Sequence, residues 1–166
     1  MEKFDFYIPT RVLFGPGKLD ELAVAKLPGQ KALIVTTAGK SVKKYGYLDR
    51  VVELLKKNHG TQSVVFDKVL PNPLLSHVRE AAALCRAEGC DFVVGLGGGS
   101  PIDTAKAVCM LMTHEGSCRD YLFGGSKTVT KPGMPLIAIP TTAGSGSEMT
   151  AAAVIEDKQK NVKLSI

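Results

Sequence analysis

Several features that often reveal the class of a protein are missing from this sequence. It contains no tryptophan, and aromatic residues make up only 6% of its 166 residues. No apolar run approaches the ~18 residues of a membrane-spanning helix, and the acidic start Met1–Asp5 lacks the apolar region of a secretion signal. No run of five like charges occurs, and the lysines are not interleaved with aromatic residues. We therefore expect a cytoplasmic protein without a membrane or nucleic-acid partner.

Local patterns for metal ions and disulfides are also absent. The four cysteines form no Cys-x-x-Cys pair, and the three histidines show neither His-x-His nor His-x-x-x-His spacing. Local sequence therefore builds no metal site, and since three of the cysteines fall in apolar or helical stretches, we expect reduced and mostly buried thiols. The residues concerned are Cys85, Cys90, Cys109, Cys118, His59, His77 and His114.

The composition is that of one folded domain with extra glycine. Hydrophobic residues make up 45% and charged residues 22%, close to the average for globular proteins. The formal net charge is +5, which we interpret as a solvated basic face. Glycine accounts for 17 residues, about 10% against a usual ~7%. Three turn clusters hold much of this excess, and two of them follow apolar runs.

Hydrophobic periodicity predicts strands that alternate with helices. Buried strands are expected over 31–36, 63–66, 91–96 and 135–140, and helices over 18–27, 41–58, 76–88 and 101–113. Short extended pieces over 4–8 and 11–14 precede them, and segments 151–156 and 162–166 are expected to pair around a turn. This alternation indicates an α/β fold with a mainly parallel sheet and helices on both faces.

The first glycine cluster follows the strand expected over 91–96. Gly97, Gly98 and Gly99 carry no Cβ that would keep a phosphate away from backbone N–H groups at the start of the next helix. Ser100 is expected to cap that helix, and Asp103 to reach back to the cap. The alternative interpretation is a tight strand-to-helix turn with an ordinary cap. The cluster does not match G-x-G-x-x-G, so it carries no Rossmann fingerprint by itself.

The second glycine cluster follows the strand expected over 135–140. Residues 140–148 hold two glycines and four hydroxyls, among them those of Thr141, Thr142 and Ser145. Hydroxyls bind ribose, phosphate or a carboxamide without adding charge. A polar linker is the alternative interpretation. Two such clusters at strand ends of one sheet favour a single elongated ligand that both of them line.

Two motifs together resemble the iron-containing, or group III, alcohol dehydrogenases. They are GGGSPIDTAKA at 97–107 and PTTAGSGSEMT at 140–150, and the segments 12–17 and 71–73 are similar too. The resemblance implies a nicotinamide-dependent oxidoreductase that interconverts alcohols with aldehydes or ketones. It also implies a Rossmann-type N-terminal domain like that of dehydroquinate synthase, with the substrate in a cleft between this domain and a helical one.

The resemblance implies roles for nine residues in cofactor binding. Gly97, Gly98, Gly99 and Ser100 would contact the pyrophosphate, Asp103 would support that turn, and Thr141, Thr142 and Ser145 would lie along the nucleotide. Lys163 matches a lysine that reaches the nicotinamide ribose, and its alternative is a solvent-exposed lysine in a strand pair.

The turn after the first expected strand bears on the choice of dinucleotide. NAD-preferring members of the family often place an aspartate at the position of Thr37, where it would bind the ribose 2′-hydroxyl and repel a 2′-phosphate. Here Thr37 is followed by Gly39, Lys40 and Ser41, which resembles NADP-using members. We therefore expect NADP ahead of NAD; the alternative interpretation of Lys40, Lys43 and Lys44 is an ordinary solvated helix start.

The family binds a divalent metal, iron and in some members zinc, through one aspartate and three histidines. These ligands belong to the part of the family beyond residue 166, so residues 1–166 are expected to form the dinucleotide-binding domain, with no catalytic or metal-binding residue and no turnover alone. The alternatives are a non-catalytic nucleotide-binding module and a polyol dehydrogenase of the same fold. The segment 4–14 could add to the sheet edge of a partner, which predicts a homo-oligomer.

Overall fold

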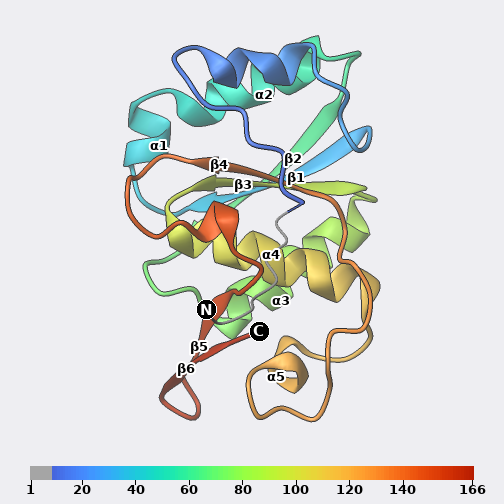
Figure 1. Ribbon diagram of the computed structural model, residues 1–166, viewed down its shortest axis with the longest axis vertical. Coiled ribbons are helices and arrows are strands. Elements are labelled where there is room, and N and C mark those ends of the chain that lie inside the picture. The colour runs from blue at the N-terminus through green and yellow to red at the C-terminus, as the bar shows by residue number, and fades with distance from the viewer. Residues whose placement is uncertain (1–8) are drawn as a thin grey trace, which may run out of the picture.

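A parallel four-stranded sheet forms the centre of the molecule (Figure 1). The structure is a computed structural model and describes residues 9–166. Its strands lie in the order β2-β1-β3-β4 and all pair in parallel. They are β1 (Lys31–Thr37), β2 (Gln62–Val69), β3 (Phe92–Gly97) and β4 (Leu136–Pro140). The predicted α/β class and the four predicted strands are confirmed.

Helices cover both faces of this sheet. In Figure 1, α2 lies on one face, and α3 and α4 lie on the other. The α-helices are α1 (Ser41–Lys44), α2 (Tyr47–Lys57), α3 (Leu75–Ala87), α4 (Gly99–Thr113) and α5 (Cys118–Tyr121), and the 3₁₀ helices are η1 (Lys18–Ala23) and η2 (Ser147–Met149). Parallel strands need such crossover helices, because the end of one strand lies far from the start of the next.

Alternate residues of the central strands fill two separate cores. On β1, Ala32 and Ile34 belong to the core with η1 and α2, whereas Leu33 and Val35 belong to the core with α3 and α4. Because both faces are covered, β1 carries an unbroken apolar run instead of an alternating pattern. That run is the reason why the sequence identifies this strand so clearly.

The predicted C-terminal strand pair is confirmed. β5 (Val154–Asp157) and β6 (Val162–Ser165) form an antiparallel hairpin outside the main sheet. The hairpin contacts α4 and is joined to the loop before α3, where the backbone N–H of Glu156 donates to the carbonyl of Pro73 at 2.7 Å. This contact brings the hairpin to the side of the molecule where β3 meets α4 (Figure 1).

The structure corrects four predicted elements. The helix predicted over 41–58 is interrupted between α1 and α2, because Gly46 has a φ of 70° in the left-handed region. The helix predicted over 18–27 is a 3₁₀ helix that ends at Ala23. β2 is longer than the predicted 63–66, and residues 11–14 form no strand. The extended piece predicted over 4–8 lies outside the described residues.

The four cysteines are free and buried, as the sequence predicts. Burial raises the pKa of Cys85 and of Cys118 to about 12 and also raises that of Cys109. These thiols therefore stay protonated at neutral pH and behave as small apolar side chains. Within residues 9–166, no helix has both the length and the apolar character needed to cross a bilayer.

Candidate functional site

The carboxyl ends of β1, β3 and β4 meet at one edge of the sheet. Thr36 pairs with Leu96, and Gly97 pairs with Pro140, so the loops that follow the three strands start side by side. The chain runs from β1 outward to β2 and from β3 outward to β4, which places the change of direction between β1 and β3. Ligands of open α/β sheets bind at such a point.

The first glycine turn, residues 97–100, joins β3 to α4. Gly97 has a φ of 139°, and Gly98 stands at the N-cap position with no side chain bonded to the helix end. The predicted Ser100 cap is wrong, because the chain is already helical at Gly99. The N–H groups of Gly99 and Ser100, in the first turn of α4, therefore have no capping side chain, and they carry the partial positive charge that attracts anions.

The second glycine turn, residues 141–147, lies directly against the first. The N–H of Thr141 donates to the carbonyl of Gly97 at 2.9 Å. A Cβ at Gly98 would lie 3.3 Å from Oγ1 of Thr142, and a Cβ at Gly99 would lie 2.9 Å from Oγ of Ser145. Two of the three glycines thus give the second turn room to approach. The structure brings both predicted clusters together at the start of α4.

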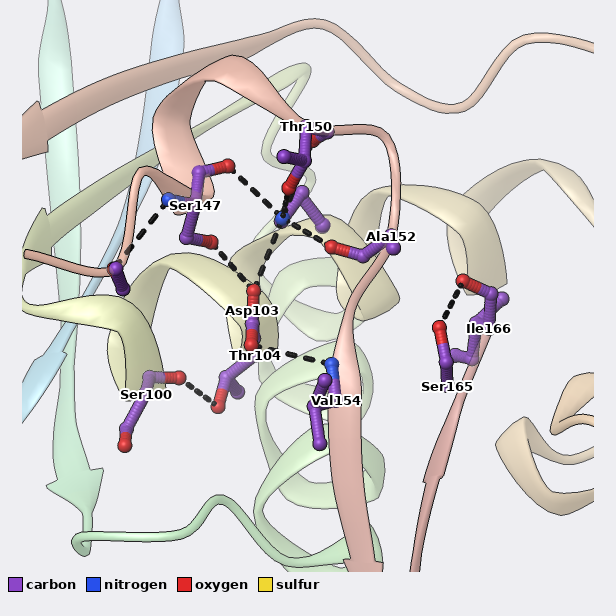
Figure 2. A network of polar contacts seen from close by, with 11 residues as sticks. Ser100, Asp103, Thr104, Ser147, Thr150, Ala152, Val154, Ser165 and Ile166 are labelled. Atoms are coloured by element: carbon purple, nitrogen blue, oxygen red, sulfur yellow. Dashed lines mark hydrogen bonds and ion pairs between the residues drawn. The ribbon is translucent and has the colours of Figure 1, made fainter.

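Asp103 supports the second turn and does not cap α4. Its carboxylate accepts from Oγ of Ser147 at 2.5 Å and from the N–H of Val154 at 3.1 Å (Figure 2). The prediction that Asp103 reaches back to the helix cap is therefore wrong. Its partners lie more than forty residues further along the chain, and the side chain is only 14% exposed among them.

Lys106 is a residue of this site to which the sequence assigned no role. Its Nζ donates to the carbonyl oxygens of Ser147 at 3.0 Å, Thr150 at 3.3 Å and Ala152, and pairs with Oδ1 of Asp103 at 3.0 Å. Figure 2 shows these labelled partners gathered around one nitrogen. The signal in the sequence is a lysine inside the otherwise apolar stretch of α4, three residues after Asp103.

A cleft of about 230 Å³ opens beside the first glycine turn. Lys163 on β6 and Asn72 both line this cleft, together with residues at the start of α4. Nζ of Lys163 donates to Oδ1 of Asn72 at 2.9 Å. Lys163 is thus held at the cleft, which three other predicted residues, Gly99, Ser100 and Asp103, also line. Asn72, which has a φ of 59°, and Glu156 were not predicted as site residues. The residues that line the cleft are Asn72, Pro73, Gly99, Ser100, Asp103, Val154, Glu156 and Lys163.

The remaining predicted residues follow β1. Oγ1 of Thr37 accepts from the N–H of Gly39 at 3.0 Å, and Lys40 and Ser41 are exposed where α1 begins. Because β1 pairs with β3, this turn lies next to the first glycine turn. The neighbouring Lys43 is paired with the carboxylate of Asp67 on β2, and this hydrogen bond lowers the pKa of Asp67.

Comparison with known proteins identifies the family. A sequence profile described as "Iron-containing alcohol dehydrogenase" matches residues 9–166. The chain belongs to the iron-containing alcohol dehydrogenase family. The two glycine turns and the cleft are therefore features of a family member, and the resemblance seen in the motifs is confirmed.

Three relatives illustrate the similarity. A choline dehydrogenase of Bacillus subtilis (strain 168) is 44% identical over 98% of this chain and 41% of its own length. The crystal structure of NADH-dependent butanol dehydrogenase A from Thermotoga maritima has a TM-score of 0.92 at 35% identity, covering 100% of this chain and 41% of that one. A sulfoacetaldehyde reductase from Bifidobacterium kashiwanohense, solved in complex with NAD+, has a TM-score of 0.87 at 32% identity, covering 100% of this chain and 43% of that one. The chain thus spans about two fifths of the length of these relatives.

The iron that gives the family its name does not fit the residues described here. Across residues 9–166, no group of three His, Cys, Asp or Glu side chains is arranged so that it could hold a metal ion. The carboxylate of Asp103, which lines the cleft, already accepts hydrogen bonds from Ser147 and Val154 and forms an ion pair with Lys106. The donors that the site does present are the N–H groups at the start of α4, the hydroxyls of the second glycine turn and the ammonium of Lys163, which suit hydrogen bonds to a polar or anionic ligand.

Proposed function

We propose that this chain is the dinucleotide-binding part of an NAD-dependent alcohol dehydrogenase. The observation that carries the proposal is the convergence of three features at one sheet edge: the uncapped start of α4, the hydroxyl-rich second glycine turn, and the cleft with Lys163. A dinucleotide needs a site for its pyrophosphate with a pocket on either side. The fit rests on the chemistry of these donors, which are N–H groups, hydroxyls and one ammonium.

The proposed binding mode follows the order of the strands. The pyrophosphate lies over Gly97, Gly98, Gly99 and Ser100, where the N–H groups of the first turn of α4 donate to it. The adenosine half extends past the β1 edge, along Thr37, Gly39, Lys40 and Ser41, and the nicotinamide half extends into the cleft toward Lys163. The hydroxyls of Thr141, Thr142 and Ser145 lie along the nucleotide.

For the cofactor we propose NAD rather than NADP, which revises the expectation from the sequence. That expectation depended on the absence of an aspartate at Thr37 and on the lysines that follow β1, and one of these lysines, Lys43, is paired with Asp67. An additional phosphate would have to compete with this carboxylate, whose lowered pKa keeps it ionised. The name of the butanol dehydrogenase and the NAD+ bound to the sulfoacetaldehyde reductase also support NAD.

The proposed reaction is hydride transfer between an alcohol and the nicotinamide ring. When bound, NAD+ accepts the hydride of the alcohol carbon while the hydroxyl loses its proton, giving an aldehyde or ketone. The residues of this chain hold the dinucleotide: the start of α4 offsets the phosphate charge, and Lys163, fixed by Asn72, donates to the ribose. We propose that the metal ligands lie outside residues 9–166. A cytoplasmic location and oligomerisation through segment 4–14 stay predictions.

Titration of the 166-residue chain with NADH tests the proposal. We expect saturable enhancement of NADH fluorescence, which Lys163→Met weakens because it removes a donor from the cleft. Lys160→Met is the matched control, since Lys160 is an exposed lysine in the turn of the same hairpin. Absence of saturable NADH binding would overturn the proposal. Metal-dependent alcohol oxidation by this chain alone would overturn the placement of the metal ligands elsewhere.

A further inference from the structure

The ammonium of Lys106 sits in a shell of protein oxygens. Three are the backbone carbonyl oxygens of Ser147, Thr150 and Ala152, a fourth is Oγ1 of Thr150 at 3.4 Å, and the fifth is Oδ1 of Asp103. The side chain is only 11% exposed, so water replaces few of these contacts. No other lysine described in residues 9–166 bonds to three backbone carbonyls.

This shell resembles the coordination of a monovalent cation more than a set of separate hydrogen bonds. An ammonium has three N–H donors, yet five oxygens converge on it. The oxygens carry partial or full negative charge, and at such short range they repel one another unless a cation lies between them. The path of the chain from Ser147 to Ala152 therefore depends on the charge of Lys106.

The segment that Lys106 holds also forms part of the site. Ser147 ends the second glycine turn, whose Ser145 faces Gly99, and Val154 lines the cleft. Asp103 receives hydrogen bonds from both ends of this segment while it pairs with Lys106. Lys106 itself is not among the residues that line the cleft. It acts on the site only through the segment 147–154.

We propose that Lys106 is a positioning residue for the nicotinamide side of the cofactor site, acting as a built-in cation that orders residues 147–154. This inference rests on the proposed function and adds a residue to it. Loss of the ammonium leaves three carbonyls without their partner, so the segment moves away from α4. The second glycine turn and the wall at Val154 then shift, whereas the turn after β1 is held by its own hydrogen bond between Gly39 and Thr37 and by the pairing of β1 with β3, and is expected to stay in place.

The inference predicts a difference between two ligands. NADH uses both halves of the site, whereas AMP uses only the half at the β1 edge and, through its phosphate, the first glycine turn. In Lys106→Met, we expect the Kd for NADH to rise about tenfold, the change that corresponds to roughly 1.4 kcal/mol, and the Kd for AMP to change less than about twofold. A general loss of stability would raise both constants together. Lys127→Met is the control, since Nζ of Lys127 also bonds to a backbone carbonyl, that of Glu115, away from the cleft.

Chemical rescue separates the charge from the packing of the side chain. In Lys106→Ala, added n-propylamine supplies the missing alkylammonium, and we expect it to restore most of the NADH affinity, whereas n-propanol does not. Lys106→Arg keeps the charge and is expected to retain more affinity than Lys106→Met. Circular dichroism confirms that each variant is folded, and hydrogen exchange of residues 145–154 provides a readout that needs no cofactor.

The outcomes distinguish the role of Lys106 from the proposed function of the chain. Faster exchange of residues 145–154 in Lys106→Met, with selective loss of NADH affinity and rescue by the amine, supports the role of Lys106. Unchanged NADH affinity in Lys106→Met, or equal losses for NADH and AMP, overturns this role while the proposed function stands. Failure of the unaltered chain to bind NADH overturns the proposed function, and the role of Lys106 in cofactor binding with it.

Discussion

The two glycine turns lie against each other but are held in different ways. The first joins two buried elements, because β3 is buried along its whole length and α4 starts within the turn itself. The second is largely exposed and lies between β4 and the short helix η2. It is held from outside, by Asp103 and Lys106 of α4. The first turn is therefore shaped by its own backbone, and the second by side chains that lie far away in the sequence.

Both turns are proposed to bind the same ligand, but their binding groups are positioned by different means. The backbone of the first turn fixes the N–H groups in place before a ligand arrives, since they belong to a helix. The hydroxyls of the second turn have no such scaffold, and their position depends on an ion pair and on carbonyl contacts. Substitutions in the first turn should therefore act mainly on stability, and substitutions in the supports of the second should act mainly on binding.

The largest effect is expected at Gly97. Its φ of 139° is rarely open to other residues, and a Cβ there would lie 2.6 Å from Cγ of Pro101. We expect Gly97→Ala to lower the free energy of unfolding by about 3 kcal/mol. Gly146→Ala is the counterpart in the second turn, where φ is 62° and the space is open, so the expected loss is about 1 kcal/mol. Urea denaturation measures both, and equal losses would contradict the comparison.

A smaller effect tests whether the turns share space. A Cβ at Gly99 would lie 3.1 Å from Cβ of Ser145 and 2.9 Å from its Oγ. We expect Gly99→Ala to be destabilising, and Ser145→Gly to relieve part of that loss because it removes the atoms in the way. A double-mutant cycle should give a coupling free energy of about 1 kcal/mol in thermal or urea unfolding. Additive changes would show that the turns do not constrain each other.

Neither glycine turn should determine the preference for NAD or NADP. Both turns face parts that NADH and NADPH share, so we expect selectivity to depend on the β1 edge, where Asp67 engages Lys43. Asp67→Asn frees the ammonium of Lys43 and should improve the Kd for NADPH about threefold, roughly 0.7 kcal/mol for an exposed pair. The Kd for NADH is expected to stay the same. Fluorescence titration with each dinucleotide measures the ratio, and Asp49→Asn, in an exposed turn of α2, is the control.

The smallest effect concerns the wall of the cleft opposite the turns. Nδ1 of His77 accepts from the N–H of Leu74 at 3.2 Å, close to Pro73 and Asn72. Burial lowers the pKa of His77 below its ordinary value of 6.5. The neutral form is therefore favoured in the folded state, so its contribution to stability is complete above pH 6.5 and is lost as the pH falls through the lowered pKa.

His77→Asn keeps an acceptor without this titration. We expect the decline in the free energy of unfolding between pH 7.5 and pH 5.5 to be smaller in the variant than in the unaltered chain. Parallel declines would show that His77 does not contribute. Since the hydrogen bond of His77 joins it to Leu74 and not to a glycine turn, the rate of hydrogen exchange in residues 97–100 and 141–147 should not respond to this substitution.

The sequence predicted the two central strands most clearly, because β1 and β3 are buried on both faces and read as continuous apolar runs. It did not predict the break at Gly46, since the apolar spacing of a helix continues across it and only the backbone angle reveals it. In the site, glycines and hydroxyls at strand ends were predictable from local chemistry. The distant partners of Asp103 were not, because a carboxylate near the start of a helix is expected to bond to the helix cap, and here it bonds to Ser147 and Val154 instead.

Asn72 and Lys106 were missed for a related reason. The role of a lone lysine in an apolar helix, or of an asparagine between two prolines, depends on which residues the fold places next to it. Lys106 faces three carbonyls that follow it by more than forty residues, and Asn72 faces Lys163 from another part of the chain. Such pairings depend on the tertiary path, which local spacing does not encode.

The segment Pro71-Asn72-Pro73 has a consequence for the thermodynamics of binding. Two pyrrolidine rings restrict the backbone on both sides of Asn72, which has a left-handed φ of 59° and accepts a hydrogen bond from Lys163 through its side-chain amide oxygen. The entropy of ordering this wall is therefore lost when the chain folds, before any ligand is present. A ligand that enters the cleft meets the ammonium of Lys163 already held in position by Asn72. The binding free energy is therefore not reduced by the entropic cost of ordering that side chain.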